Sequence, residues 1–107
     1  MPYEKFGRND EKYLWTAHVR MKMRQYGLAE SRIKRVIRFP ARTEEGVAEK
    51  TIAVMQPAGT KRYQEIWAMY RVSRGKLKII TAWRYPGKSP ARDPIPQEIL
   101  REVKRLL

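Results

Sequence analysis

Two consecutive segments, residues 64–72 and 76–85, constrain the fold of this chain most strongly. Both alternate with the period of a β-strand, and both carry apolar side chains on each of their two sides. A tight turn is predicted at residues 73–75 between them, because Gly75 lies there. Strands that are apolar on both sides are typical of the middle of a sheet rather than its edge.

The alternation assigns each side chain of these two strands to one of two sides. In the first strand, one side holds Ile66, Ala68, Tyr70 and Val72, and the other Glu65, Trp67, Met69 and Arg71. In the second strand, one side holds Leu77, Ile79, Thr81, Trp83 and Tyr85, and the other Lys78, Ile80, Ala82 and Arg84. We therefore expect Ile80 and Arg84 on the same side of the sheet.

Two segments with the helical period precede the strands, over residues 16–26 and 29–39. Thr16 is suited to cap the first helix, while Gly27 and Pro40 are suited to end the two helices. Between the helices and the two central strands, residues 41–45 and 51–56 are further strand candidates, and residues 13–16 are a short strand or an apolar lead-in.

The order of these segments predicts an α+β fold. We expect two N-terminal helices packed on a small antiparallel sheet of three to four strands, followed by a short C-terminal helix near residues 96–106. All helices are expected on one face of the sheet, which leaves the opposite face to solvent or to a ligand. Residues 1–12 are expected to form a flexible basic arm, and residues 13–107 a single domain.

Positive charge dominates the composition. The 24 Lys and Arg residues outnumber 11 Asp and Glu residues, for a formal net charge of +13. The net charge is +6 over residues 1–40, −1 over 41–60 and +8 over 61–107. Like charges weaken a compact state, so this surplus predicts a polyanionic partner, with RNA as the first candidate. An acidic protein is the alternative partner.

Other classes of function find less support in the composition. The chain has no Cys and a single His, which argues against a metal site, and we expect no cofactor. The N-terminus lacks the apolar core of a signal peptide, and no apolar run is long enough to span a bilayer. We therefore expect a cytoplasmic protein without a membrane partner.

Two stretches resemble parts of a bacterial family of uncharacterised function. His18–Leu28 resembles its opening helix, with Lys22 where Arg is usual, and Ile80–Arg84 resembles its last strand. That family looks like a branch of the RelE/ParE-type toxin superfamily, with BrnT-like toxins as relatives. The resemblance covers about residues 13–85 and implies a RelE-like or barnase-like α+β fold.

Several residues are candidates for metal-free RNA cleavage, which needs a base for the ribose 2′-OH and cations on the phosphate. His18 is suited to act as the base, because the helix N-terminus favours its neutral form. Its simpler interpretation is a His that satisfies hydrogen bonds within the fold. RelE-type toxins are thought to use Arg, Lys and Tyr for this chemistry. By that resemblance the candidates are Arg71, Arg84, Tyr70 and Tyr85, with Glu65 as an alternative base.

We expect Arg71 and Arg84 to lie close together on neighbouring strands. Arg84 is then expected to matter more than His18, because a cation held on a rigid strand stabilises a developing phosphorane charge. The alternative is that both arginines form ordinary surface salt bridges, with Glu65 as a possible partner. We therefore leave enzyme activity open.

A second group of residues is predicted to contact nucleic acid without taking part in chemistry. Trp67 and Trp83 could stack on bases, although we expect one of them to lie in the core. The basic members of the group are Arg32, Lys34, Arg35 and Arg38 on the second helix, and Lys88 in the loop after the last strand. A solvated basic helix face is the alternative interpretation.

Three functions are consistent with these features. The first is an RNA-binding protein of the RelE/BrnT-like toxin fold that acts as a metal-independent ribonuclease. The second is a non-catalytic module that binds nucleic acid or the ribosome. The third is an interaction protein whose basic surface docks an acidic partner.

Overall fold

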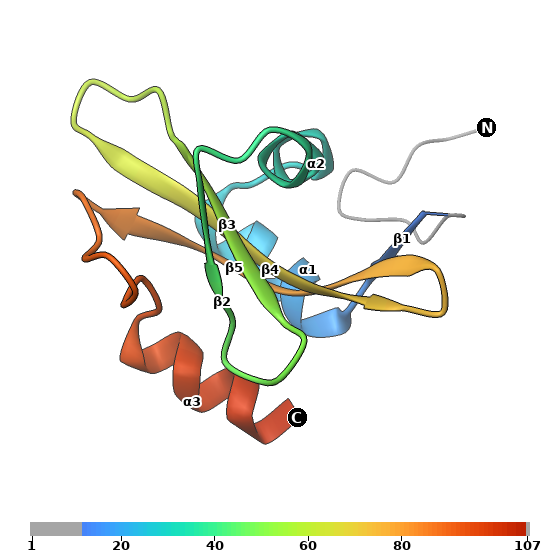
Figure 1. Cartoon of the computed structure of the whole chain (residues 1–107). Helices are drawn as coiled ribbons and strands as arrows, with labels where there is room; N and C mark the ends of the chain where they lie inside the picture. The colour runs from blue at the N-terminus through green and yellow to red at the C-terminus, as the bar shows by residue number, and fades with distance from the viewer. Residues whose placement is uncertain (1–11, 107) are drawn as a thin grey trace.

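A computed structural model describes residues 12–106 of the chain. The predicted N-terminal arm lies outside the described residues except for Lys12. Five strands and three helices follow in the order β1 Tyr13–Trp15, α1 Ala17–Tyr26, α2 Glu30–Arg38, β2 Arg42–Glu45, β3 Ile52–Pro57, β4 Gln64–Ser73, β5 Lys76–Pro86 and α3 Gln97–Leu106. This is the predicted α+β class (Figure 1).

The strands form one mixed sheet in the order β1-β5-β4-β3-β2. Strands β2 to β5 are antiparallel, with β4 and β5 in the interior of the sheet as predicted. The fifth strand exceeds the predicted three to four. It is β1, which pairs parallel to β5, and its register runs from Tyr13 opposite Leu77 to Trp15 opposite Ile79.

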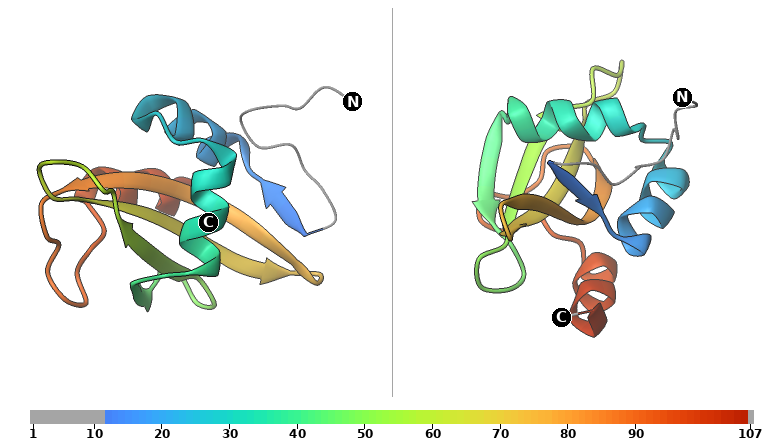
Figure 2. Two further views of the ribbon diagram at one scale, coloured as in Figure 1. Left: turned by 90° about the horizontal axis from the view of Figure 1, so that it is seen from above. Right: turned by 90° about the vertical axis from the view of Figure 1, so that its right-hand side faces the viewer.

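Both faces of the sheet are covered, so the prediction that all helices lie on one face is wrong for α3. Helices α1 and α2 pack on one face, and strands of the sheet separate α2 from α3 (Figure 2). On the α3 face, Ile99 and Val103 pack with Trp67, Met69 and Trp83. These large apolar side chains need a cover from water. The C-terminal helix supplies it.

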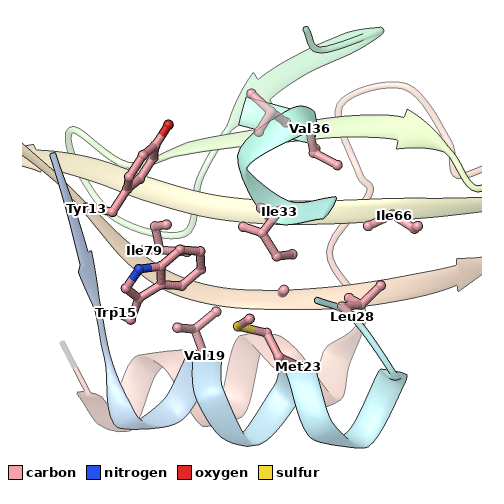
Figure 3. Packing of buried hydrophobic residues seen from close by; sticks show 12 residues of the cluster. Tyr13, Trp15, Val19, Met23, Leu28, Ile33, Val36, Ile66 and Ile79 are labelled. Carbon is pink, nitrogen blue, oxygen red and sulfur yellow. The ribbon is translucent and has the colours of Figure 1, made fainter. Parts of the chain in front are cut away.

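The core under α1 and α2 fixes the position of α1 along the sheet. Val19 and Met23 of α1 lie among Trp15 of β1, Ile79 of β5 and Ile33 of α2 (Figure 3). All five side chains are buried. The start of α1 is therefore held close to the middle of β5.

Caps define both ends of α1 as predicted. The Thr16 hydroxyl accepts a hydrogen bond from Val19 N at 3.1 Å and lies 2.8 Å from Ile79 O, to which it donates. At the other end, Gly27 has φ +66°, a left-handed conformation that suits glycine. The helix therefore runs from a fixed start beside β5 to a defined end.

A β-bulge in β5 changes the predicted alternation. Met69 lies opposite Thr81, and the next residue, Tyr70, lies opposite Ile79, so that Ile80 is an extra residue in β5. Ile80 and Thr81 both lie on the α3 side, and Arg84 lies on the α1 side instead of sharing a side with Ile80. A simple alternation cannot anticipate this shift, because one extra residue moves every later side chain of the strand to the opposite face of the sheet.

None of the helices in the described part of the chain is long and apolar enough to cross a membrane.

Candidate functional site

A cavity of about 210 Å³ lies beside the bulge, where the start of α1 meets the β4–β5 hairpin and the end of α3. It is lined by Thr16, Ala17, His18, Arg71, Lys78, Ile80 and Leu106. Two of these side chains carry a permanent positive charge, and none is a carboxylate. The positive end of the α1 dipole adds to the potential of this cavity, which therefore favours an anion.

Arg71 and Lys78 form the cationic wall of the cavity. They are cross-strand partners in the β4–β5 hairpin. Like charges directly opposite each other destabilise a strand pair. Neither side chain lies within ion-pair distance of a carboxylate in the described part of the chain. An anion in the cavity would compensate both charges.

His18 forms the neighbouring wall, and its side chain is only 9% exposed. Its Nε2 lies 3.1 Å from Thr81 Oγ1 and 3.4 Å from Glu102 Oε2. Burial lowers the pKa of His18 most strongly, Glu102 opposes this shift, and Lys22 adds to it. The imidazole is therefore neutral near neutral pH. The adjacent carboxylate, an obligate acceptor, favours the tautomer with the proton on Nε2, which leaves Nδ1 as the basic nitrogen.

A buried ion pair between Lys22 and Glu102 lies next to His18. The Lys22 side chain is 1% exposed, and its Nζ donates to Glu102 Oε1 at 2.8 Å and to Gln25 Oε1 at 3.1 Å. Glu102 thus lies between Lys22 and His18 and joins α3 to α1. A buried ammonium group is tolerated only when it is paired and hydrogen-bonded in this way.

Lys22, Glu102 and Lys78 are not among the residues that the sequence assigns to the candidate site. A signal for the first was present, because Lys22 follows His18 by four residues and so lies on the same side of α1. Glu98 and Glu102 have the same spacing on the last helix. Nothing in the sequence shows that α1 and α3 meet, because the contact joins residues that lie far apart in the chain.

The structure brings together His18 and Arg71 from the predicted catalytic set, but not Arg84. Arg84 lies on the α1 side of the sheet, where its Nε donates to Tyr26 O at 2.9 Å. Its cross-strand partner is Ile66, five residues before Arg71 on β4, which separates the two arginines by about 16 Å along the strand. The prediction that Arg71 and Arg84 lie close together is therefore wrong. The β5 bulge is part of the reason, because it moves Arg84 to the other face.

The two predicted tyrosines lie apart from the cavity as well. Tyr70 packs against the core under α1 and α2, while Tyr85 packs against the core under α3 and pairs with Glu65. Neither is among the residues that line the cavity. The predicted grouping of Arg84, Tyr70 and Tyr85 around one phosphate is not present.

Glu65, the predicted alternative base, lies in a buried hydrogen-bond network and does not line the cavity. It is fully buried and accepts hydrogen bonds from Ser89 Oγ at 2.6 Å, Trp67 Nε1 at 3.0 Å and Tyr63 OH at 3.0 Å. Burial alone would raise its pKa, but these hydrogen bonds outweigh burial and lower it. Arg42 Nη1 lies 3.7 Å from Glu65 Oε2, so Glu65 pairs with Arg42 and not with Arg71 or Arg84, as the alternative interpretation would have required.

Trp67 and Trp83 are both core residues, although we expected only one of them there. Each is 0% exposed, and their rings stack with centroids 5.7 Å apart at an angle of 3°. The prediction that Trp67 stacks on a nucleotide base is therefore wrong. Trp67 and Trp83 are cross-strand partners on the two central strands, and α3 covers their stacked rings from water.

The predicted nucleic-acid contacts on α2 lie on the opposite face of the sheet from the cavity. Lys34 pairs with Glu30 at 2.7 Å, and Arg32 donates to Pro57 O at 2.9 Å. Arg35 and Arg38 are exposed. Lys88 is exposed in the loop after β5. None of these five basic residues lines the cavity.

Within residues 12–106, no three His, Cys, Asp or Glu side chains are grouped so that they could hold a metal ion. Comparisons with protein-family models, curated proteins and solved structures find no match to this chain. The likeness to RelE and BrnT-like toxins therefore stays a resemblance of short motifs.

Proposed function

We propose that this protein binds single-stranded RNA and that one phosphate of the strand occupies the cavity beside α1. The observation that carries the proposal is the pair Arg71 and Lys78 at the start of a helix, two cations without a carboxylate partner among residues 12–106. Phosphate groups are the ligands that cationic side chains at a helix N-terminus bind best. The resemblance to RelE and BrnT-like toxins supports the same proposal, which includes a cytoplasmic location.

The overall charge favours a chain of phosphates over a single small anion. The net charge of +13 far exceeds what one phosphate in the cavity would compensate. Neutralisation of several phosphates, with release of their counterions, drives the binding of basic proteins to nucleic acid. A longer RNA strand is therefore the preferred ligand of the proposed site.

The proposal is tested by fluorescence anisotropy with a labelled single-stranded RNA of 12 nucleotides. Arg71→Gln and Lys78→Gln should each weaken binding by about tenfold, which corresponds to the removal of one charge-assisted hydrogen bond. Arg101→Gln is the matched control, because it removes one exposed charge on α3 away from the cavity. Equal affinities for all three variants would contradict the proposed site. Failure of the wild type to bind RNA, with binding of an acidic protein, would favour the interaction protein.

A second candidate function is metal-independent cleavage of the bound RNA. The observation that favours it is His18, which is neutral at neutral pH, backed by Glu102 and placed in the same cavity wall as the two cations. In this proposal, His18 Nδ1 takes the proton of a ribose 2′-OH, and the 2′-oxygen attacks phosphorus. The bond from phosphorus to the 5′-oxygen breaks, and that oxygen takes a proton from water. The hydroxide that remains takes the proton held by His18, which restores the neutral imidazole. Arg71 and Lys78 stabilise the charge that develops on the phosphorane.

Cleavage is tested with the same RNA and with its 2′-deoxy analogue, both in EDTA. The wild type should cleave only the RNA and leave a 2′,3′-cyclic phosphate, which mass spectrometry identifies. His18→Gln should lower the cleavage rate by about 10²-fold or more while RNA binding changes little. Tight binding without any cleavage by the wild type would instead favour the non-catalytic module.

A further inference from the structure

Three arginines gather on the sheet face opposite the cavity, where α1 ends and α2 crosses the sheet. Arg84 Nε donates to Tyr26 O, in the last turn of α1, at 2.9 Å. Arg32 Nη2 donates to Pro57 O, at the end of β3, at 2.9 Å. Arg35 lies on the same helix, one turn after Arg32. Backbone carbonyls thus hold two of the three guanidinium groups in place.

Sheet register brings these arginines to one place. Gln56 of β3, Ile66 of β4 and Arg84 of β5 form a row across three adjacent strands. Gln56 Nε2 donates to Arg35 O at 3.3 Å and to Phe39 O at 2.8 Å, which fixes α2 over one end of the row. Two strand spacings, about 10 Å, separate that end from the Arg84 backbone, a gap that long Arg side chains can bridge. Burial lowers the pKa of Arg32 most strongly, and the positive charges of Arg35 and Arg84 lower it further, as their proximity requires.

The charge of this cluster is not compensated within the described residues. None of the three arginines lies within ion-pair distance of a carboxylate there. Arg32 Nε is in addition buried without a hydrogen-bond partner. Three guanidinium groups in one place repel one another, and this repulsion is relieved when an anion binds between them. Phosphate suits such a cluster, because guanidinium groups bind its oxygens in pairs.

We infer that Arg32, Arg35 and Arg84 form a second phosphate site, which holds another phosphate of the RNA strand bound at the cavity. The inference rests on the proposed function. Helix α1 connects the two sites, because its first residues line the cavity and its last carbonyl holds Arg84. At about 1.5 Å per residue, its ten residues span about 15 Å. Small folds that bind single strands contact about 4–16 nucleotides, so one strand can reach both sites.

The inference makes affinity depend on the length of the RNA. A dinucleotide carries one phosphate and can occupy only one of the two sites at a time, whereas a strand of 12 nucleotides can reach both. Arg84→Gln and Arg35→Gln should each weaken binding of the 12-nucleotide RNA by about tenfold and leave binding of the dinucleotide to the cavity unchanged. Arg71→Gln should weaken both ligands, and Arg101→Gln neither. Dinucleotide binding is followed by chemical-shift changes in NMR spectra, which also report whether each variant is folded.

Arg35→Gln is the decisive variant, because the Arg35 side chain is exposed and its replacement leaves the packing of α1 and α2 intact. Unchanged affinity of both Arg35→Gln and a folded Arg84→Gln for the 12-nucleotide RNA would overturn the second site and leave the proposed function standing. Equal losses for the dinucleotide and the longer RNA in Arg35→Gln and Arg84→Gln would overturn the inference of two linked sites, since both ligands would then use the arginine cluster alone. Failure of the wild type to bind either RNA would overturn the proposed function together with this inference.

Discussion

Glu102 is the residue on which the cavity wall depends, because one of its carboxylate oxygens pairs with Lys22 and the other faces His18. Lys22 is almost completely buried, so its charge cannot be hydrated when its partner is removed. Removal of one member of a buried pair costs far more than removal of an exposed one. Two glutamates on the same helix allow this difference to be measured.

We predict that Glu102→Gln lowers the free energy of unfolding by about 3 kcal/mol. Glu98→Gln is the matched control, because Glu98 is 61% exposed and its carboxylate lies 3.8 Å from Lys22 Nζ. This control substitution should cost less than about 1 kcal/mol. Urea denaturation followed by circular dichroism measures both values. Similar values for the two variants would show that Glu102 does not carry the buried charge.

The lowered pKa of His18 predicts that the stability of the protein depends on pH. Burial lowers its pKa in the folded protein, so the unfolded chain binds the proton more tightly. The free energy of unfolding should therefore fall as the pH drops below about 6.5, the ordinary pKa of His, and level off below the folded pKa. His18→Gln should remove the slope that begins below about pH 6.5. The slope at lower pH from Glu65 and Glu44, whose pKa values are lowered, should remain. The same slope in both proteins would contradict the role of burial at His18.

At the scale of elements, helix α3 has two roles. It covers the stacked pair Trp67 and Trp83 through Ile99 and Val103, and it carries Glu102 to the cavity. Both roles depend on one docking arrangement, so weaker packing of α3 should also alter the environment of His18. The order of the elements thus places part of the candidate site on the last helix.

We predict that Ile99→Ala lowers the free energy of unfolding by about 2–4 kcal/mol, because its side chain is 0% exposed and packs under the sheet. Leu106→Ala, on the same helix, should cost less than about 1 kcal/mol, because Leu106 is 56% exposed. Denaturation in urea measures the difference, and tryptophan fluorescence reports whether the stacked pair becomes more exposed. A destabilisation at Leu106 as large as that at Ile99 would contradict the docking of α3.

Sequence patterns predict the elements of this chain better than their arrangement. The caps Thr16 and Gly27 act locally, so the bounds of α1 follow from the sequence. The face covered by α3 and the parallel pairing of β1 depend on contacts between distant segments, which periodicity does not encode. The single extra residue Ile80 in β5 is part of the reason why Arg84 lies apart from His18 and Arg71.

At the scale of the whole molecule, the two basic surfaces lie on opposite sides of one sheet. The cavity with Arg71 and Lys78 opens beside α3, and the arginine cluster lies where α1 ends. Helix α1 links them along β5 (Figure 1). The proposed RNA strand therefore follows α1 around the molecule. We expect phosphate charge to govern its binding more than stacking on Trp67 or Trp83, because both of these side chains are buried.

The salt dependence of RNA affinity tests this account most directly. The logarithm of the affinity should fall linearly with the logarithm of the salt concentration, and loss of each phosphate contact should flatten the slope by about one unit. We predict that the double variant Arg71→Gln, Lys78→Gln, which loses the one phosphate of the cavity, binds the 12-nucleotide RNA with a slope flatter by about one unit than that of the wild type. The control Arg101→Gln should keep the wild-type slope. A wild-type slope in the folded double variant would contradict the claim that a phosphate occupies the cavity.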